Sequence, residues 1–173
     1  MKYAYGLGLT AAFAGPASAA AIDMTVTIPQ LKVAEYHKPY VAIWLEQAGA
    51  PNANTPNAGT LAIWYQFTKD KNEGNKWLRD VRTWWRKSGR TLNNPVSGIT
   101  GATRAPGPQK VSFTPKQVGK LAPGNYELVV EAARESGGRE LLRMPFTWPA
   151  KGAATVKAEG KTELGAVTAT IKP

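Results

Sequence analysis

Short segments in which apolar and polar residues alternate are the feature that most constrains the fold of this chain. Successive side chains of a strand point to opposite faces, so a period of two predicts strands. Turn-forming Gly, Pro and Asn residues separate the segments at intervals of roughly ten residues. The segments are 22–33 (its strand ending near Pro29), 40–46, 60–67, 110–113, 127–133, 139–148, 153–159 and 164–171. This pattern predicts a mainly β fold, an immunoglobulin-like β-sandwich.

Two of these segments predict a long hairpin, and the Asn-, Pro-, Ala- and Gly-rich residues 48–59 between them predict an exposed loop. In 40–46, one face carries Val41, Ile43 and Leu45, and the other carries Tyr40, Ala42, Trp44 and Glu46. In 60–67, one face carries Leu61, Ile63, Tyr65 and Phe67, and the other carries Ala62 and Trp64. Trp44 and Trp64 therefore lie opposite the aliphatic face. Either a helix covers them or they form an aromatic surface for a flat ligand.

A helical pattern interrupts the strands from Asn75 onward. The spacing i, i+4, i+7, i+8 is typical of one face of an amphipathic helix packed on a core. The residues with this spacing are Trp77, Val81, Trp84 and Trp85, and the opposite side carries Arg79, Arg82, Arg86 and Lys87. Ser88 and Gly89 end the predicted helix.

The corner before the segment 127–133 has a recognisable sequence. Leu121-Ala122-Pro123-Gly124-Asn125-Tyr126 is similar to the tyrosine corner of immunoglobulin-like sandwiches. There the tyrosine hydroxyl satisfies a backbone group. In the strand that follows, Tyr126, Leu128, Val130 and Ala132 form one apolar face.

The first residues predict export. Lys2 precedes an apolar run from Tyr3 to about Pro16, and Ala17-Ser18-Ala19 then forms a small-residue cleavage site, so we expect a signal peptide over 1–19. The run is shorter than the roughly 20 residues that a membrane-spanning helix needs. Residues 20–173 then form a single domain that is not an integral membrane protein.

The amino-acid composition excludes some kinds of functional site. The chain has no cysteine, which excludes metal–thiolate sites and cysteine nucleophiles. Its formal net charge is +10. An exported protein rarely meets nucleic acid, so we expect anionic phosphates, acidic proteins or a membrane surface as partners.

The residue types that usually act in catalysis do not form a recognisable catalytic set in this sequence. His37 is the sole histidine and follows no catalytic pattern, so a solvated loop position is expected. Glu127 and Glu131 lie on the outward face of one strand, where solvated carboxylates are expected rather than a general acid and base. A hydrolase therefore lacks a coherent nucleophile, base and oxyanion set.

The segment 90–108 is rich in Pro and Gly and shows no period. Loops of this length inside a compact domain are usually functional or disordered. Its most informative run is Ser97-Gly98-Ile99-Thr100-Gly101-Ala102-Thr103-Arg104. Gly101 and Ala102 leave the Thr103 hydroxyl accessible to a modifying enzyme, and Arg104 is a cation suited to a phosphate. Composition alone equally allows a structural Gly-rich turn.

The sequence also resembles, across nearly all of residues 20–173, the predicted periplasmic family known as domain of unknown function 2271. Short motifs spread along the chain carry the resemblance. They are Tyr40-Val41-Ala42-Ile43-Trp44-Leu45-Glu46, Leu61-Ala62-Ile63-Trp64, Trp77-Leu78, Trp84-Trp85, Thr100-Gly101-Ala102-Thr103-Arg104, Gly124-Asn125-Tyr126 and Val130-Glu131-Ala132-Ala133-Arg134-Glu135.

The run from Thr100 to Thr103 is similar to the acceptor motif of covalent flavoproteins, Asp-x-x-Ser/Thr-Gly-Ala-Thr. In that motif a flavin transferase of the ApbE type uses magnesium and FAD to join FMN to the last threonine. The resemblance implies Thr103 as the acceptor, with Thr100, Gly101 and Ala102 completing the motif. Ser97 departs from it, because it stands where the motif has Asp.

Two functions follow as hypotheses. The first is an exported flavin-bearing electron carrier or accessory subunit rather than a stand-alone enzyme. Its covalent FMN would lie near Arg104 and against Trp44, Trp64 or the helix aromatics, and would pass electrons from a membrane redox partner to an acceptor such as a ferric complex. The resemblance implies this link to iron reduction outside the cytosol. The second is a cofactor-free immunoglobulin-like binding module that docks a membrane or envelope partner through Arg79, Arg82, Arg86 and Lys87.

Overall fold

The strands observed in a computed structural model follow the predicted segments closely. The structure describes residues 21–49, 59–67 and 70–172. The strands are β1 Ala21–Ile28, β2 Tyr40–Gln47, β3 Gly59–Trp64, β4 Thr100–Gly101, β5 Gly107–Phe113, β6 Gly124–Ala133, β7 Arg139–Trp148, β8 Ala154–Glu159 and β9 Ala166–Lys172. The predicted signal peptide with its cleavage site and most of the predicted loop 48–59 lie outside the described residues.

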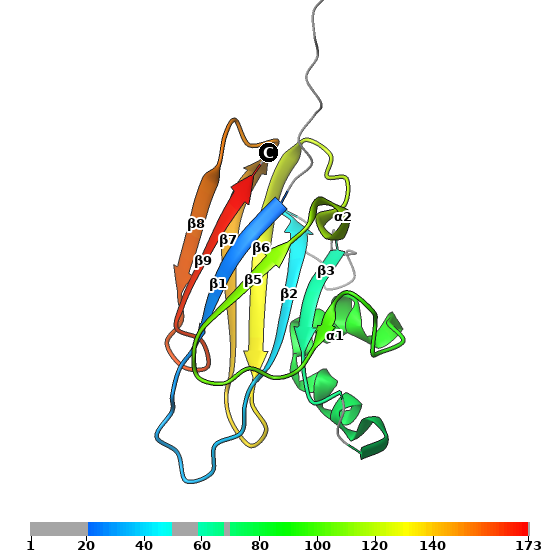
Figure 1. Ribbon diagram of the computed structural model, residues 1–173, viewed down its shortest axis with the longest axis vertical. Helices are drawn as coiled ribbons and strands as arrows, with labels where there is room; N and C mark the ends of the chain where they lie inside the picture. Colours follow the sequence, from blue (N-terminus) through cyan, green and yellow to red (C-terminus); the bar gives the residue numbers. More distant parts are fainter. Residues whose placement is uncertain (1–20, 50–58, 68–69, 173) are drawn as a thin grey trace, which may run out of the picture.

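Two sheets pack face to face (Figure 1). One has the strand order β5-β1-β9-β8, and the other has the order β4-β3-β2-β6-β7. The pairing is antiparallel except between β3 and β4. The prediction of a mainly β sandwich is therefore confirmed. No helix among the described residues is long and apolar enough to cross a membrane.

The five-stranded sheet buries both of its faces because β2 is apolar on both sides. Val41, Ile43 and Leu45 face the core between the sheets, as does the predicted apolar face of β6. Tyr40, Ala42 and Trp44 belong to a second core on the outer face of this sheet. Helical residues complete that second core, so one sheet supports two hydrophobic layers.

A bulge in β3 changes the predicted faces of the hairpin. Ile43 pairs with Ala62, but Trp44 pairs with Thr60, so Leu61 is an extra residue in the ladder. Leu61 therefore joins Ala62 and Trp64 in the core between the sheets instead of facing the same way as Ile63. The prediction that Trp44 and Trp64 share one face is wrong. The register, in which Val41 pairs with Trp64, turns the two indoles to opposite sides of the sheet.

The helical segment is mostly a 3₁₀-helix. It comprises η1 Asp70–Asp80, α1 Arg82–Lys87 and η2 Gly89–Thr91, and a separate one-turn helix, α2 Pro115–Val118, follows β5. Its buried hydrophobic side chains, among those described, are Leu78, Val81 and Trp84, at intervals of three, which is the repeat of a 3₁₀-helix. Trp77, predicted to be in the core, is instead 39% exposed, because an interval of four from Val81 does not fit this repeat.

The predicted tyrosine corner is present. The Tyr126 hydroxyl donates a hydrogen bond to the carbonyl of Ala122 at 2.9 Å. This bond satisfies a backbone acceptor where the chain enters β6, as the sequence of the corner indicates.

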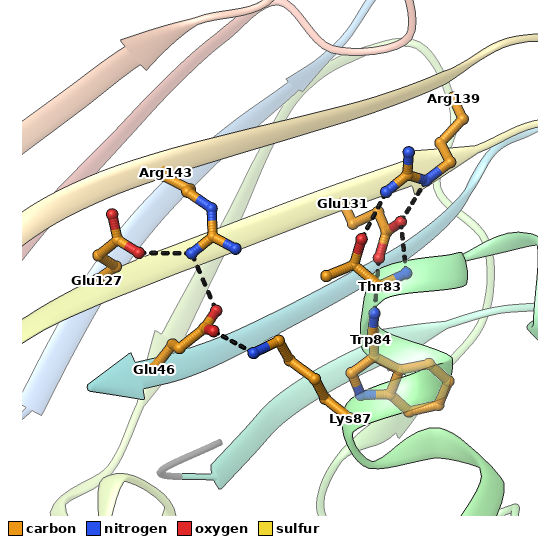
Figure 2. A network of polar contacts seen from close by, with 8 residues as sticks. All are labelled: Glu46, Thr83, Trp84, Lys87, Glu127, Glu131, Arg139 and Arg143. Carbon is orange, nitrogen blue, oxygen red and sulfur yellow. Dashed lines mark hydrogen bonds and ion pairs between the residues drawn. The ribbon is translucent and has the colours of Figure 1, made fainter. Parts of the chain in front are cut away.

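Two carboxylates fasten the helical segment to the outer face of the five-stranded sheet (Figure 2). Glu131 on β6 is completely buried and accepts hydrogen bonds from the backbone N–H groups of Thr83 and Trp84, at 3.0 and 2.8 Å. Arg139 pairs with the same carboxylate. The expectation that Glu131 is solvated is therefore wrong, because the helix start covers it.

The second carboxylate, Glu46 on β2, pairs with Lys87 at the end of α1 and with Arg143 on β7 (Figure 2). Arg143 also pairs with the partly exposed Glu127. Burial opposes ionisation of Glu46, but the hydrogen bonds from Lys87 and Arg143 outweigh it and hold the pKa of the carboxyl below its ordinary value. Lys87 is only 5% exposed, so it does not belong to the solvated basic side predicted for the helix.

At the far end of the sandwich, Glu140 on β7 caps the connection between β8 and β9. Its carboxylate accepts hydrogen bonds from four consecutive backbone N–H groups, those of Lys161, Thr162, Glu163 and Leu164, at 2.7 to 3.0 Å. Partial burial acts to raise the pKa of Glu140, but these backbone hydrogen bonds dominate and lower it. The contact links the two sheets, because β7 and β8 belong to different ones.

The lowered pKa of Glu140 predicts a pH-dependent contribution to stability. The unfolded state binds the proton more readily, so the contribution is complete above the unfolded value of about 4.5 and is lost as pH falls through the folded pKa. We expect E140Q to lower the free energy of unfolding by about 1 to 2 kcal/mol at pH 7 and by less at pH 3. Urea unfolding at both pH values, with exposed Glu159→Gln as the control, measures this. An equal loss at the two pH values would contradict it.

Candidate functional site

The run from Ser97 to Arg104 lies along the edge of the five-stranded sheet rather than in a structureless loop. Thr100 and Gly101 form β4, which pairs in parallel with Ile63 and Trp64 of β3. The Ile63 N–H donates to the Ile99 carbonyl at 2.8 Å, and the Tyr65 N–H donates to the Gly101 carbonyl at 2.9 Å. The first half of the acceptor-like motif is thus held by the sheet.

Thr100 uses its hydroxyl inside the protein. Its Oγ1 accepts a hydrogen bond from the Val96 N–H at 2.9 Å, and its own N–H donates to the Val96 carbonyl at 3.0 Å. These two bonds close the turn that contains Ser97 and Gly98. Gly98 has a φ of +83°, in the left-handed region that favours glycine. Ser97, at the position of the motif's Asp, is exposed in this turn.

Gly101 and Arg104 both contact the Trp64 indole. A Cβ atom on Gly101 would lie 3.2 Å from Cδ1 of Trp64, so glycine permits this close packing. The Arg104 guanidinium lies 5.1 Å from the centre of the Trp64 ring, within the range of a cation–π contact. Trp64 itself is only 2% exposed, because it belongs to the core between the sheets. Its indole therefore contacts Gly101 and Arg104 of the motif from the core side.

Thr103 lies between these anchored residues, after β4 has ended. Its side chain is partly exposed, and within the described part of the chain no hydrogen bond engages its hydroxyl. Ala102 and Arg104 on either side are exposed. The two threonines of the motif therefore differ, because the Thr100 hydroxyl has a structural partner and the Thr103 hydroxyl has none among the described residues.

A shallow pocket of about 160 Å³ lies beside this segment. Its lining includes Trp64, Gly101 and Arg104 together with Ser112, Phe113 and Gln117. Pockets that enclose a cofactor-sized ligand usually measure about 300 to 1,000 Å³. This one has room for a small polar group beside the arginine, and a three-ring system would lie outside it.

The other predicted site residues lie elsewhere. Trp44 is completely buried in the second core, beneath the helical segment and with Trp84, so of the two alternatives for this residue the helical cover is the one observed. His37 lies between two carboxylates, with Nε2 at 3.2 Å from Glu35 and Nδ1 at 3.7 Å from Glu135. Neither contact involves the segment around Thr103.

Pattern reasoning missed the buried carboxylates Glu46 and Glu131. A Glu that alternates with an apolar neighbour, as Glu46 does with Leu45 and Glu131 with Val130, has the same local pattern as a solvated residue. One signal in the sequence is the charge of residues 70–91, where seven Lys and Arg residues outnumber the three carboxylates Asp70, Glu73 and Asp80. That excess indicates partners elsewhere without naming them.

Comparison with protein families identifies one match. Residues 21–166 match the model of the family described as "Predicted periplasmic protein (DUF2271)". No curated protein and no solved structure matches the chain significantly. The matched stretch extends from β1 to the first residue of β9 and includes the helical segment and the edge segment around Thr103. The chain therefore belongs to this family of predicted periplasmic proteins.

Proposed function

We propose that this protein is an exported electron carrier with FMN attached to Thr103 through a phosphodiester bond. The observation that carries the proposal is the difference between the two motif threonines. The Thr100 hydroxyl is held by the Val96 N–H, whereas Thr103 is a partly exposed residue whose hydroxyl has no described hydrogen-bond partner. An acceptor must present a hydroxyl that an enzyme can reach, and the partial exposure of Thr103 supports that role.

The attachment step balances with FAD as the donor. The Thr103 oxygen would bond to the phosphorus on the FMN side of FAD, the pyrophosphate P–O bond would break, AMP would leave, and the hydroxyl proton would pass to solvent. A flavin transferase of the ApbE type with magnesium is the enzyme class for this reaction. The role of this chain is to present the hydroxyl and to supply positive charge nearby.

Arg104 is the residue that would meet the new phosphate. Its guanidinium is always charged and can hold two phosphate oxygens at once. The contact with Trp64 restrains the side chain next to the acceptor without neutralising its charge. The adjacent pocket of about 160 Å³ can accept a phosphate-sized group. Arg104 is therefore assigned to phosphate binding, with Gly101 and Trp64 positioning it.

The flavin ring would lie on the surface. Trp44 has no exposed area and Trp64 has 2%, so neither offers a face for stacking, and the proposal includes Trp64 only as a support for Arg104. FMN would supply reversible uptake and release of electrons when bound. A surface position suits a carrier that exchanges electrons with larger partners, a membrane redox protein on one side and an acceptor such as a ferric complex on the other.

Co-expression with a flavin transferase of the ApbE type in an exporting host tests the proposal. We expect the wild-type protein to gain the FMN mass and visible absorption, and T103A to lose both while its circular dichroism is unchanged. The matched control is Thr168→Ala, an exposed threonine of β9 in the other sheet. S97D, which restores the acidic residue of the motif, is expected to raise the labelled fraction. Flavin retained in T103A, or unlabelled wild type beside a labelled control acceptor, would refute the proposal.

A further inference from the structure

The helical segment carries four exposed arginines within twelve residues. Arg79 ends η1, Arg82 and Arg86 lie on α1, and Arg90 lies on η2; these four residues are called the arginine face. All four are exposed. Lys87, which the sequence pattern groups with Arg79, Arg82 and Arg86, is not part of this set because it pairs with Glu46.

The geometry of α1 places two of the four arginines opposite its buried residue. Trp84 is completely buried against the sheet. Arg82 and Arg86 lie two positions before and after it, about 200° around the helix at 100° per residue. They therefore start from the side of α1 opposite the buried indole, and Arg82 also borders a pocket beside the turn between β6 and β7. Figure 1 shows this helical segment on the outside of the sandwich, next to β3.

The arginine face is not neutralised by neighbouring carboxylates. Within the described residues none of the four arginines forms an ion pair. Between residues 70 and 91 the chain has three carboxylates, Asp70, Glu73 and Asp80, of which Glu73 pairs with Lys76. The same stretch has seven Lys and Arg residues, which leaves an excess of positive charge along this segment.

The residues around the arginine face favour a lipid surface over a protein as the partner. Stable protein interfaces have an apolar centre from which charges are depleted. In the described part of the chain the exposed large hydrophobic residues are Val33 and Trp77, and only Trp77 belongs to the helical segment. Arginine binds phosphate oxygens in pairs, and tryptophan is enriched at the boundary between lipid headgroups and hydrocarbon.

We propose that the arginine face docks this protein on the anionic phospholipid surface of a membrane. The guanidinium groups would bind lipid phosphates, and Trp77 at the margin would enter the headgroup layer. The buried contacts of Glu131 and Glu46 hold α1 in place beneath these side chains (Figure 2). The proposal does not depend on flavin at Thr103, since the two surfaces use different residues.

Vesicle co-sedimentation tests the docking proposal with the exported full chain. Two kinds of vesicle are compared, phosphatidylcholine alone and a 70:30 mixture of phosphatidylcholine and phosphatidylglycerol, at low and high salt. Each basic residue near an anionic surface contributes about 1 kcal/mol, so neutralising four of them is expected to weaken binding to the mixed vesicles on the order of a thousandfold. The variant is R79Q/R82Q/R86Q/R90Q. Binding of the wild type is expected to fall with salt.

The matched control removes the same charge elsewhere. Its four lysines are exposed and unpaired in the described structure, and the variant is K110Q/K116Q/K120Q/K157Q. We expect it to bind within about threefold of the wild type, because these positions lie outside the arginine face. Equal losses in both variants would assign binding to net charge and overturn the proposal. The proposal would also be overturned if the wild-type protein did not bind the mixed vesicles at low salt. That conclusion would hold even if the protein bound an acidic protein through the same arginines.

Discussion

Removal of the Glu131 carboxylate is expected to lower the free energy of unfolding by about 3 to 5 kcal/mol, the usual cost of breaking a buried charge pair. E131A would leave the N–H groups of Thr83 and Trp84 without an acceptor and Arg139 without its partner. For a domain of this size the loss corresponds to a fall in melting temperature of roughly 10 °C. Thermal and urea unfolding followed by circular dichroism measure it.

Glu127 supplies the matched control, four residues earlier on the same face of β6. Its side chain is 26% exposed, and its partner Arg143 keeps Glu46 when Glu127 is removed. We expect E127A to cost less than about 1 kcal/mol. E131Q, which retains one acceptor oxygen, should fall between E131A and the wild type and remains measurable if E131A does not fold. Similar costs for E127A and E131A would show that Glu131 does not fasten the helix.

Strand positions could be predicted from the sequence because alternation is a local property. The segment predicted at 40–46 became Tyr40–Gln47, and the apolar face predicted for Tyr126, Leu128, Val130 and Ala132 is the face in the core. Each of these patterns extends over six or more residues of one strand. A pattern of that length within one strand is enough to locate the strand, so the predicted and observed strand positions agree.

Faces and partners that depend on register could not be predicted in this way. The bulge at Leu61 is a property of two strands together, and neither strand alone shows it. The ion pairs of Glu46 with Lys87 and of Glu131 with Arg139 connect separate elements. The exposed Trp77 follows from a 3₁₀ repeat, which the spacing of four tryptophan and valine residues suggested was an α-helix.

The candidate site was predicted as a segment, and its geometry was not. The residues from Thr100 to Arg104 were chosen for accessible small residues and a neighbouring cation. That choice did not anticipate β4, which ties Gly101 to β3, or the Trp64 ring beneath Arg104. Both contacts join positions about forty residues apart, for which a single sequence holds no local signal.

The pair of Arg134 and Glu163 offers a second test of buried charge, at the place where the two sheets meet. Arg134 follows β6 of the five-stranded sheet, and Glu163 lies in the connection from β8 to β9 of the other sheet. Two hydrogen bonds of 3.0 and 3.2 Å join them, and the side chains are 8% and 4% exposed. We expect E163A to lower the free energy of unfolding by about 3 to 5 kcal/mol, since it leaves a buried guanidinium unpaired.

The double variant R134M/E163L separates the attraction between the charges from the cost of burying them. In this variant apolar side chains replace both charged ones. Its free energy of unfolding should therefore lie within about 1.5 kcal/mol of the wild-type value. A small loss is expected because the Gly138 N–H no longer has its acceptor. The single variants R134M and E163L complete the thermodynamic cycle by urea unfolding, and the cycle should show a coupling energy above about 1 kcal/mol. If the losses of the single variants simply add, the two residues act independently. The hydrogen bonds of Glu140 with its four backbone donors would then be the stronger polar link between the sheets at this end.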